Sequence, residues 1–165
     1  ASSLWLEREP TREEIWADLQ KRDLTQYPEL IFCGYGEPTC RLEDMLWVCR
    51  KIREISSISI RINTNGLCDL INGRSTAQEF DGLVDTISIS LNAPAAEKYD
   101  AICHSQYGLE AFPAILKFTR AVSFFVPQVV LSVVDKDLTR REIAECGRLC
   151  KEAGAIFRVR EYIPD

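Results

Sequence analysis

The sequence predicts an α/β fold, a partial (β/α) TIM-like barrel with about five parallel strands and flanking helices. Short apolar runs alternate with amphipathic segments of helical spacing, and the connections between them are short. Each predicted strand also leads into polar or glycine-rich residues, which is typical of the ligand-binding edge of a parallel sheet. With 165 residues, 46% of them hydrophobic, the chain can bury one core, and no linker divides it. We therefore expect a single domain spanning residues 1–165.

The elements of the N-terminal half are predicted from caps and apolar periodicity. A capping box, Thr11-Arg-Glu-Glu14, opens the first helix just after Pro10. Apolar residues at every third or fourth position predict a helix, whereas strict alternation predicts a strand. In chain order these rules give a helix over 11–22, a strand over 30–33, a helix over 42–55, a strand over 58–62 and short helices around residues 70 and 80.

The C-terminal half follows the same rules. Pro113 is compatible with a helix only in its first turn, and a second capping box, Thr139-Arg-Arg-Glu142, opens a helix that Gly154 ends. The predicted elements are a strand over 84–91, helices over 95–102 and 108–124, a strand over 129–134, a helix over 139–153 and a strand over 156–159.

Composition and charge argue against several classes of protein. The net charge of −5 argues against a nucleic-acid partner. No apolar run approaches the ~20 residues that cross a membrane, and no signal peptide is visible, so no membrane partner is expected. Seven cysteines at irregular spacings suit a reducing cytoplasm better than a disulfide framework. We expect most of these thiols to be packed, and we expect no preformed metal site in this chain.

The candidate site consists of polar and glycine residues at or beyond the strand ends. In a parallel sheet these ends lie at one edge, so the residues are expected to converge. The candidates are Gly34, Gly36, Glu37, Asn63, Asn65, Ser88, Ser90, Asn92, Lys136 and Arg160. Simpler roles stay open: Glu37 as a helix cap, Ser88 as an ordinary sheet residue, and Lys136 in a solvated turn.

Several motifs resemble the radical S-adenosylmethionine (radical SAM) superfamily. The loop Gly34-Tyr-Gly-Glu37 is similar to its Gly-Gly-Glu motif, although Tyr35 separates the glycines. Five blocks in order resemble the radical SAM proteins linked to TatD-type nucleases. These blocks are Leu4-Trp-Leu-Glu-Arg-Glu-Pro10, Phe32-Cys-Gly-Tyr-Gly-Glu-Pro38, Arg61-Ile-Asn-Thr-Asn-Gly66, Ser88-Ile-Ser-Leu-Asn-Ala-Pro94 and Phe157-Arg-Val-Arg-Glu-Tyr162.

The resemblance implies a SAM-binding part of a radical SAM enzyme. Glu37 and the backbone of Gly34 and Gly36 would then hold the methionine ammonium, and Ser90 and Asn92 the ribose. Lys136 or Arg160 would pair with a carboxylate. In the intact enzyme a [4Fe–4S] cluster would cleave SAM to a 5′-deoxyadenosyl radical, with an electron donor such as a flavodoxin or ferredoxin. The substrate does not follow from the resemblance.

The chain departs from that superfamily in its cysteines. None has the Cys-x3-Cys-x2-Cys spacing that holds the cluster. We expect the first strand and the cluster loop of the radical SAM core to precede Ala1, which would leave this fragment catalytically silent. Cys33 would then be a packed thiol at a strand end. The uncovered edge of the strand over 30–33 would pair with a second copy, as a dimer, or with the N-terminal segment.

Two other functions remain open from the sequence. The first is a non-catalytic radical SAM-like domain that binds a nucleotide or a protein. The second is an unrelated barrel enzyme that uses Glu37, Asp85 or Asp135 as an acid, a base or a Mg²⁺ ligand.

Overall fold

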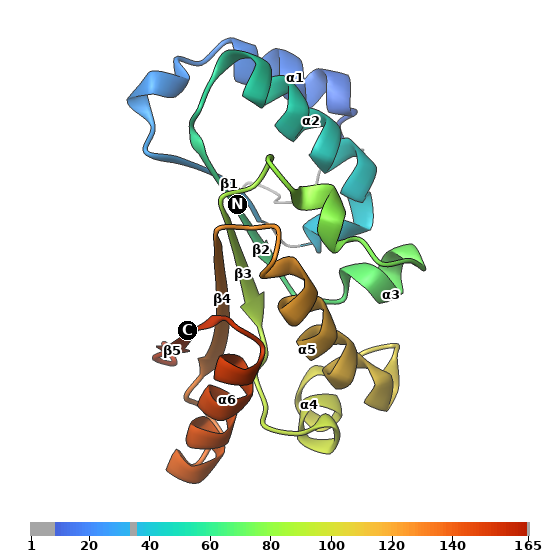
Figure 1. Ribbon diagram of the computed structural model, residues 1–165, viewed down its shortest axis with the longest axis vertical. Coiled ribbons are helices and arrows are strands. Elements are labelled where there is room, and N and C mark those ends of the chain that lie inside the picture. The colour runs from blue at the N-terminus through green and yellow to red at the C-terminus, as the bar shows by residue number, and fades with distance from the viewer. Residues whose placement is uncertain (1–8, 34–35, 165) are drawn as a thin grey trace.

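The computed structural model describes residues 9–33 and 36–164 (Figure 1). Most of the predicted block at Leu4–Pro10, and both Gly34 and Tyr35, therefore lie outside the described residues. The strands are β1 (Glu29–Phe32), β2 (Ser59–Thr64), β3 (Thr86–Ser90), β4 (Gln128–Val134) and β5 (Ile156–Arg160). The longer helices are α1 (Arg12–Gln20), α2 (Leu42–Ile55), α3 (Cys68–Asn72), α4 (Ala96–Cys103), α5 (Ala111–Val122) and α6 (Arg140–Glu152).

The strands form one five-stranded sheet in the order β1-β2-β3-β4-β5, and every pair is parallel. This confirms the predicted α/β class and the predicted parallel strands with flanking helices. Within the described residues β1 pairs only with β2, and β5 only with β4. The described sheet is thus open at both edges, and its strand order is the one that a partial (β/α) barrel would have.

One face of the sheet is apolar and covered by helices. Alternate strand residues on this face are fully buried: Ile60, Ile62, Ile87, Ile89, Leu131 and Val133. Helices α5 and α6 pack against it, and the position of a Cβ on Gly147 of α6 would lie 3.3 Å from the Phe157 ring of β5. In Figure 1, α2, α5 and α6 follow one another along the sheet. This layer provides the core of the molecule.

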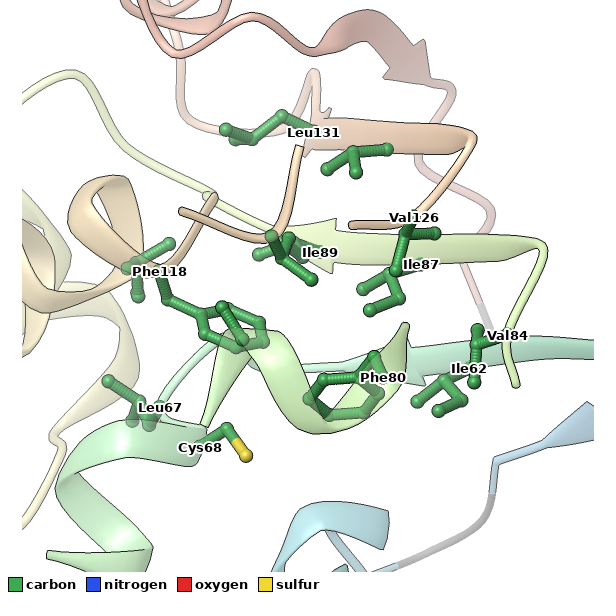
Figure 2. Packing of buried hydrophobic residues seen from close by; sticks show 14 of the residues in the cluster. Ile62, Leu67, Cys68, Phe80, Val84, Ile87, Ile89, Phe118, Val126 and Leu131 are labelled. Atoms are coloured by element: carbon green, nitrogen blue, oxygen red, sulfur yellow. The ribbon is translucent and has the colours of Figure 1, made fainter. Parts of the chain in front are cut away.

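On the same face, the segment between β2 and β3 contributes an aromatic side chain to the core. Phe80, in a short 3-10 helix (Ala77–Phe80), meets Phe118 of α5 edge to face, with ring centroids 6.1 Å apart. Figure 2 shows these two rings among side chains of β2, β3 and β4 such as Ile62, Ile89 and Leu131. Burying such aromatic rings contributes strongly to stability, so this cluster fixes the segment between β2 and β3.

The opposite face carries mostly polar side chains. The register aligns Arg61 with Thr86, and Ser90 with Ser132 and Arg158, so these residues share a face. At the sheet margins this face is open, since Ile31 is 47% and Ile156 52% exposed. Near its centre Ser132 is only 3% exposed, which is what a concave surface would produce. We call it the open face.

Most predicted boundaries are close to the observed ones. The capping boxes at Thr11 and Thr139 are both present, and Pro113 lies in the first turn of α5. Strand β2 continues to Thr64, past the predicted end at Ile62. No helix in the described part of the chain has the length and apolar character needed to span a membrane.

The prediction that the thiols are mostly packed is confirmed for Cys49, Cys68, Cys146 and Cys150, which are buried. It is wrong for Cys33, which is exposed just beyond β1. The reason is that β1 is an edge strand with no neighbour on one side within the described residues. Cys40, in the short 3-10 helix Pro38–Arg41, is exposed as well.

Candidate functional site

A cavity of about 450 Å³ lies beyond the carboxyl ends of β1, β2 and β3. Four predicted residues line it: Glu37 after β1, Asn65 after β2, Ser90 at the end of β3, and Asn92 just beyond. The structure thus brings together side chains that are far apart in the sequence. Ligands of parallel α/β folds bind at this edge of the sheet.

Glu37 connects the ends of β1 and β2. One carboxylate oxygen, Oε2, accepts hydrogen bonds from the Thr39 amide (3.0 Å), the Thr39 hydroxyl and the Thr64 hydroxyl (2.7 Å). The other, Oε1, accepts from the Asn65 amide at 2.7 Å. Glu37 is therefore the N-cap of the short helix after β1, as one of the alternatives proposed, and it also holds the β2 end. Bonds to a charged carboxylate are strong enough to fix the cavity rim.

The turn after β2 is fixed by its own side chains. The Asn65 carboxamide oxygen accepts from the Leu67 amide at 2.9 Å, and the Thr64 hydroxyl accepts from the Gly66 amide at 3.2 Å. Gly66 has φ +81°, and a Cβ there would lie 2.7 Å from Ile89 Cγ2. Only glycine fits this close approach without strain. The turn directs Asn65 to the cavity while Gly66 packs on the core.

Asn92 occupies an unusual backbone position beside the cavity. Its φ is 65°, in the left-handed region that asparagine tolerates better than most residues. Its Oδ1 atom is buried, and no described residue donates a hydrogen bond to it. A buried acceptor without a donor costs about 1–3 kcal/mol, so a ligand donor would relieve this penalty.

Helix α4 and the loop after it supply the outer wall of the cavity. Tyr99 and Cys103, one helical turn apart on α4, line it together with Tyr107. Burial raises the pKa of the Tyr99 phenol, and neighbouring Cys103 raises it further. Burial, and then the Glu37 carboxylate, likewise raise the pKa of the Cys40 thiol at the rim. These groups are therefore neutral near pH 7 and line a weakly polar wall.

Cys68 connects the two short helices between β2 and β3. The Thr76 hydroxyl lies within hydrogen-bond range of its sulfur, at 3.1 Å, and of the Asp69 carboxylate, at 2.7 Å. Burial raises the pKa of the Cys68 thiol to about 11. This thiol is a packed structural group and not a nucleophile at neutral pH.

Five described candidate residues do not line this cavity. Asn63 lies on the open face, where its oxygen accepts from Arg61 Nε at 3.2 Å, because β2 extends to Thr64. Ser88 lies one pleat before Ser90, paired with Asn63. Lys136 and Arg160 lie at the ends of β4 and β5, with Lys136 stacked 4.3 Å from the Tyr162 ring centroid. Gly36 borders a neighbouring apolar cavity that Glu37 shares.

The sequence pointed to no role for Cys40, Cys103, Leu67 or Ile71, all of which line the cavity. For Tyr99 and Tyr107 the sequence alone leaves two roles open, a contact with the substrate or packing in the core or at the rim. One signal was available for α4: Tyr99 and Cys103 lie four residues apart, opposite the charged residues of a short helix. Nothing in the sequence indicated which part of the sheet that helix would meet.

The carboxylates of the unrelated-enzyme alternative do not meet. Asp85 precedes β3, at the amino edge of the sheet, where it accepts from Arg53 Nη2 at 2.6 Å and from the Ile60 amide at 2.8 Å. Asp135 follows β4 and accepts from the Tyr162 amide at 2.9 Å. Glu37 stands beyond β1. The three carboxylates therefore do not form one group.

No group of three or more histidine, cysteine or acidic side chains within residues 9–33 and 36–164 is placed to hold a metal ion. All seven cysteines are among the described residues, and all are free thiols. A scan against protein-family models finds none that matches this chain, and no curated protein matches it.

Proposed function

We propose that this chain is the SAM-binding part of a radical SAM enzyme, acting on a substrate still to be identified. The observation that carries the proposal is the meeting of Glu37, Asn65, Ser90 and Asn92 in one cavity beyond three successive parallel strands. These are residues of the motifs that resemble the superfamily. The fold class and the position at the carboxyl edge support the same conclusion.

The size of the cavity and its mixed lining support SAM as the ligand. Small-molecule sites usually measure about 300–1,000 Å³, and this cavity measures about 450 Å³. Its lining combines apolar Leu67 and Ile71 with hydroxyl and carboxamide side chains. The half-buried Tyr107 ring offers a face that attracts a cation such as a sulfonium.

Each polar residue has a role that follows from its surroundings. The Asn92 carboxamide oxygen has no donor among the described residues, so it suits a ribose hydroxyl, and Ser90, at the end of β3, lines the same cavity. Glu37 already accepts four hydrogen bonds from Thr39, Thr64 and Asn65. Its negative charge favours the methionine ammonium, while its hydrogen bonds hold the β1 and β2 ends in position. Bound SAM would supply the 5′-deoxyadenosyl group.

The residues of this chain do not fit a [4Fe–4S] cluster. The cysteines are dispersed, and four of them are buried, namely Cys49, Cys68, Cys146 and Cys150. No step that needs the cluster is therefore assigned to this chain, whose own part is to bind and orient SAM. We expect purified chain to bind SAM without cleaving it.

Isothermal titration of the chain with SAM tests the proposal, and β3 offers a matched pair of variants. Ser90→Ala removes a hydroxyl that lines the cavity, whereas Ser88→Ala removes the same group one pleat away. We expect Ser90→Ala to weaken SAM binding about three- to tenfold, the loss of one hydrogen bond of about 0.5–1.5 kcal/mol. Ser88→Ala should leave it unchanged.

A second variant tests the unpaired acceptor. Asn92→Gly keeps the left-handed backbone but removes the carboxamide, and it should weaken SAM binding by a similar factor. The absence of SAM binding by the wild-type chain would contradict the proposal. So would equal losses in the Ser88→Ala and Ser90→Ala variants, since binding would then lie outside this cavity.

A further inference from the structure

The open face carries arginines whose charge is not neutralised. Arg158 and Arg160 occupy alternate positions of β5, so both side chains leave the strand on the same side, with Cα atoms ~7 Å apart. Among the described residues neither makes an ion pair or a side-chain hydrogen bond. By contrast, Arg53 and Arg148 are paired with acidic side chains. The chain has more acidic than basic residues, 25 against 20, and an arginine without an acidic partner is available to bind an anion.

The two arginines border a hollow at the end of β5. It measures about 490 Å³ and is lined by Arg158 and Arg160 together with Val134, Glu161 and Tyr162. Acidic groups are close, but none neutralises the arginines: Asp135 accepts from the Tyr162 amide, and Glu161 forms no described ion pair. Lys136 adds a third cation, stacked on the Tyr162 ring.

The pairing of the strands places the hollow near the cavity that we propose binds SAM. The register places Ser90 of β3, Ser132 of β4 and Arg158 of β5 in one row across the open face. Neighbouring strands are ~4.8 Å apart, so Arg158 lies two strand spacings, ~10 Å, from the serine that lines the SAM cavity. A guanidinium side chain and a small molecule together span that distance.

We propose that Arg158 and Arg160 bind an oxyanionic group, a phosphate or a carboxylate, of the substrate, and so hold it on the open face beside the SAM cavity. Guanidinium groups form forked, charge-assisted hydrogen bonds with such groups. The assignment of the anion to the substrate rests on the proposed function, whereas the proposal that the two arginines bind an anion is independent of it. The substrate class is thus a small anionic molecule whose reactive part lies toward Ser90.

The test is a titration of the full chain with inorganic phosphate in one arm and succinate in the other, followed by NMR of the arginine side chains. Arg158→Gln and Arg160→Gln should each lower the affinity for the preferred anion at least fivefold, and binding should weaken with added salt. Arg50→Gln, an exposed arginine on α2, is the matched control and should change nothing. Arg158→Lys should retain part of the affinity, because the charge remains but the fork is lost. The arm with the higher affinity identifies the anion.

The alternative is that these arginines only protect the edge strand β5 from pairing with another chain. In that case the double variant Arg158→Gln/Arg160→Gln would associate, as measured by light scattering, and its affinity for the anion would equal that of the wild-type chain. This result would overturn the proposal. Equal anion affinity in the wild-type and double-variant chains, or no binding of either anion, would also overturn it. SAM titration of the same samples separates the two proposals. Anion binding without SAM binding would leave the arginine site standing and refute only the proposed function.

Discussion

The two faces of the sheet are built from alternate residues of the same strands, yet their chemistry is opposite. In β3, Ile87 and Ile89 point to the helices and are fully buried, while Ser88 and Ser90 point to the open face and are half-buried. In β5 the same alternation places Phe157 against α6 and the arginines on the open side. Stability is therefore concentrated on one face, which leaves the other free to bind ligands.

The largest expected effect tests this division directly. Ile89→Ala should lower the free energy of unfolding by about 2–5 kcal/mol, since it removes buried methyl groups and leaves a cavity. Ser88→Ala, the adjacent residue on the open face, should change it by less than about 0.5 kcal/mol. Urea denaturation of both variants measures the contrast. Similar losses in the two variants would mean that the open face is covered in the folded protein.

The next effect concerns the turn where the two faces meet. Gly66→Ala should cost about 2–4 kcal/mol, because the new Cβ is forced into a left-handed backbone and would lie 2.7 Å from Ile89 Cγ2. The double variant Gly66→Ala/Ile89→Ala is the control. It removes the clashing methyl group, so urea midpoints should show a loss smaller than the sum of the single losses. Strict additivity would contradict the close approach of the two residues.

The class of fold and the strand ends could be predicted because both depend on local pattern. Alternation in residues 58–62 and 84–91 identifies strands whatever lies around them, and capping boxes at Thr11 and Thr139 mark helix starts directly. Parallel strands then require that their ends share an edge. This is why Glu37, Asn65, Ser90 and Asn92 could be expected together.

The sequence predicts less well which residues line the site, because this depends on strand register and on packing between elements that are distant in the sequence. Asn63 and Asn65 look equivalent in sequence, but β2 continues to Thr64 and turns at Gly66, which separates them. Cys103 enters the site only because α4 packs over the ends of the strands. Cys33 follows a strand as the predicted packed thiol would, but an edge position exposes it.

The smallest expected effect lies in the helical layer, between α4 and α6. Lys98 Nζ donates to Glu142 Oε2 at 2.7 Å, and this hydrogen bond, followed by one from the Thr139 amide, lowers the pKa of the Glu142 carboxyl. Because the pKa of the Glu142 carboxyl is lower in the folded than in the unfolded state, its charge stabilises the fold above the unfolded-state pKa of about 4.3. This stabilisation is lost as the pH falls through the folded-state pKa. Glu142→Gln should therefore lower the urea midpoint slightly at pH 7, and the difference from wild type should diminish as the pH falls below the unfolded value of about 4.3. Glu54→Gln, an exposed residue of α2, should show no such pH dependence. If the difference at pH 7 persisted in acid, the hydrogen bonds of the capping box at Thr139 and not the charge of Glu142 would account for it.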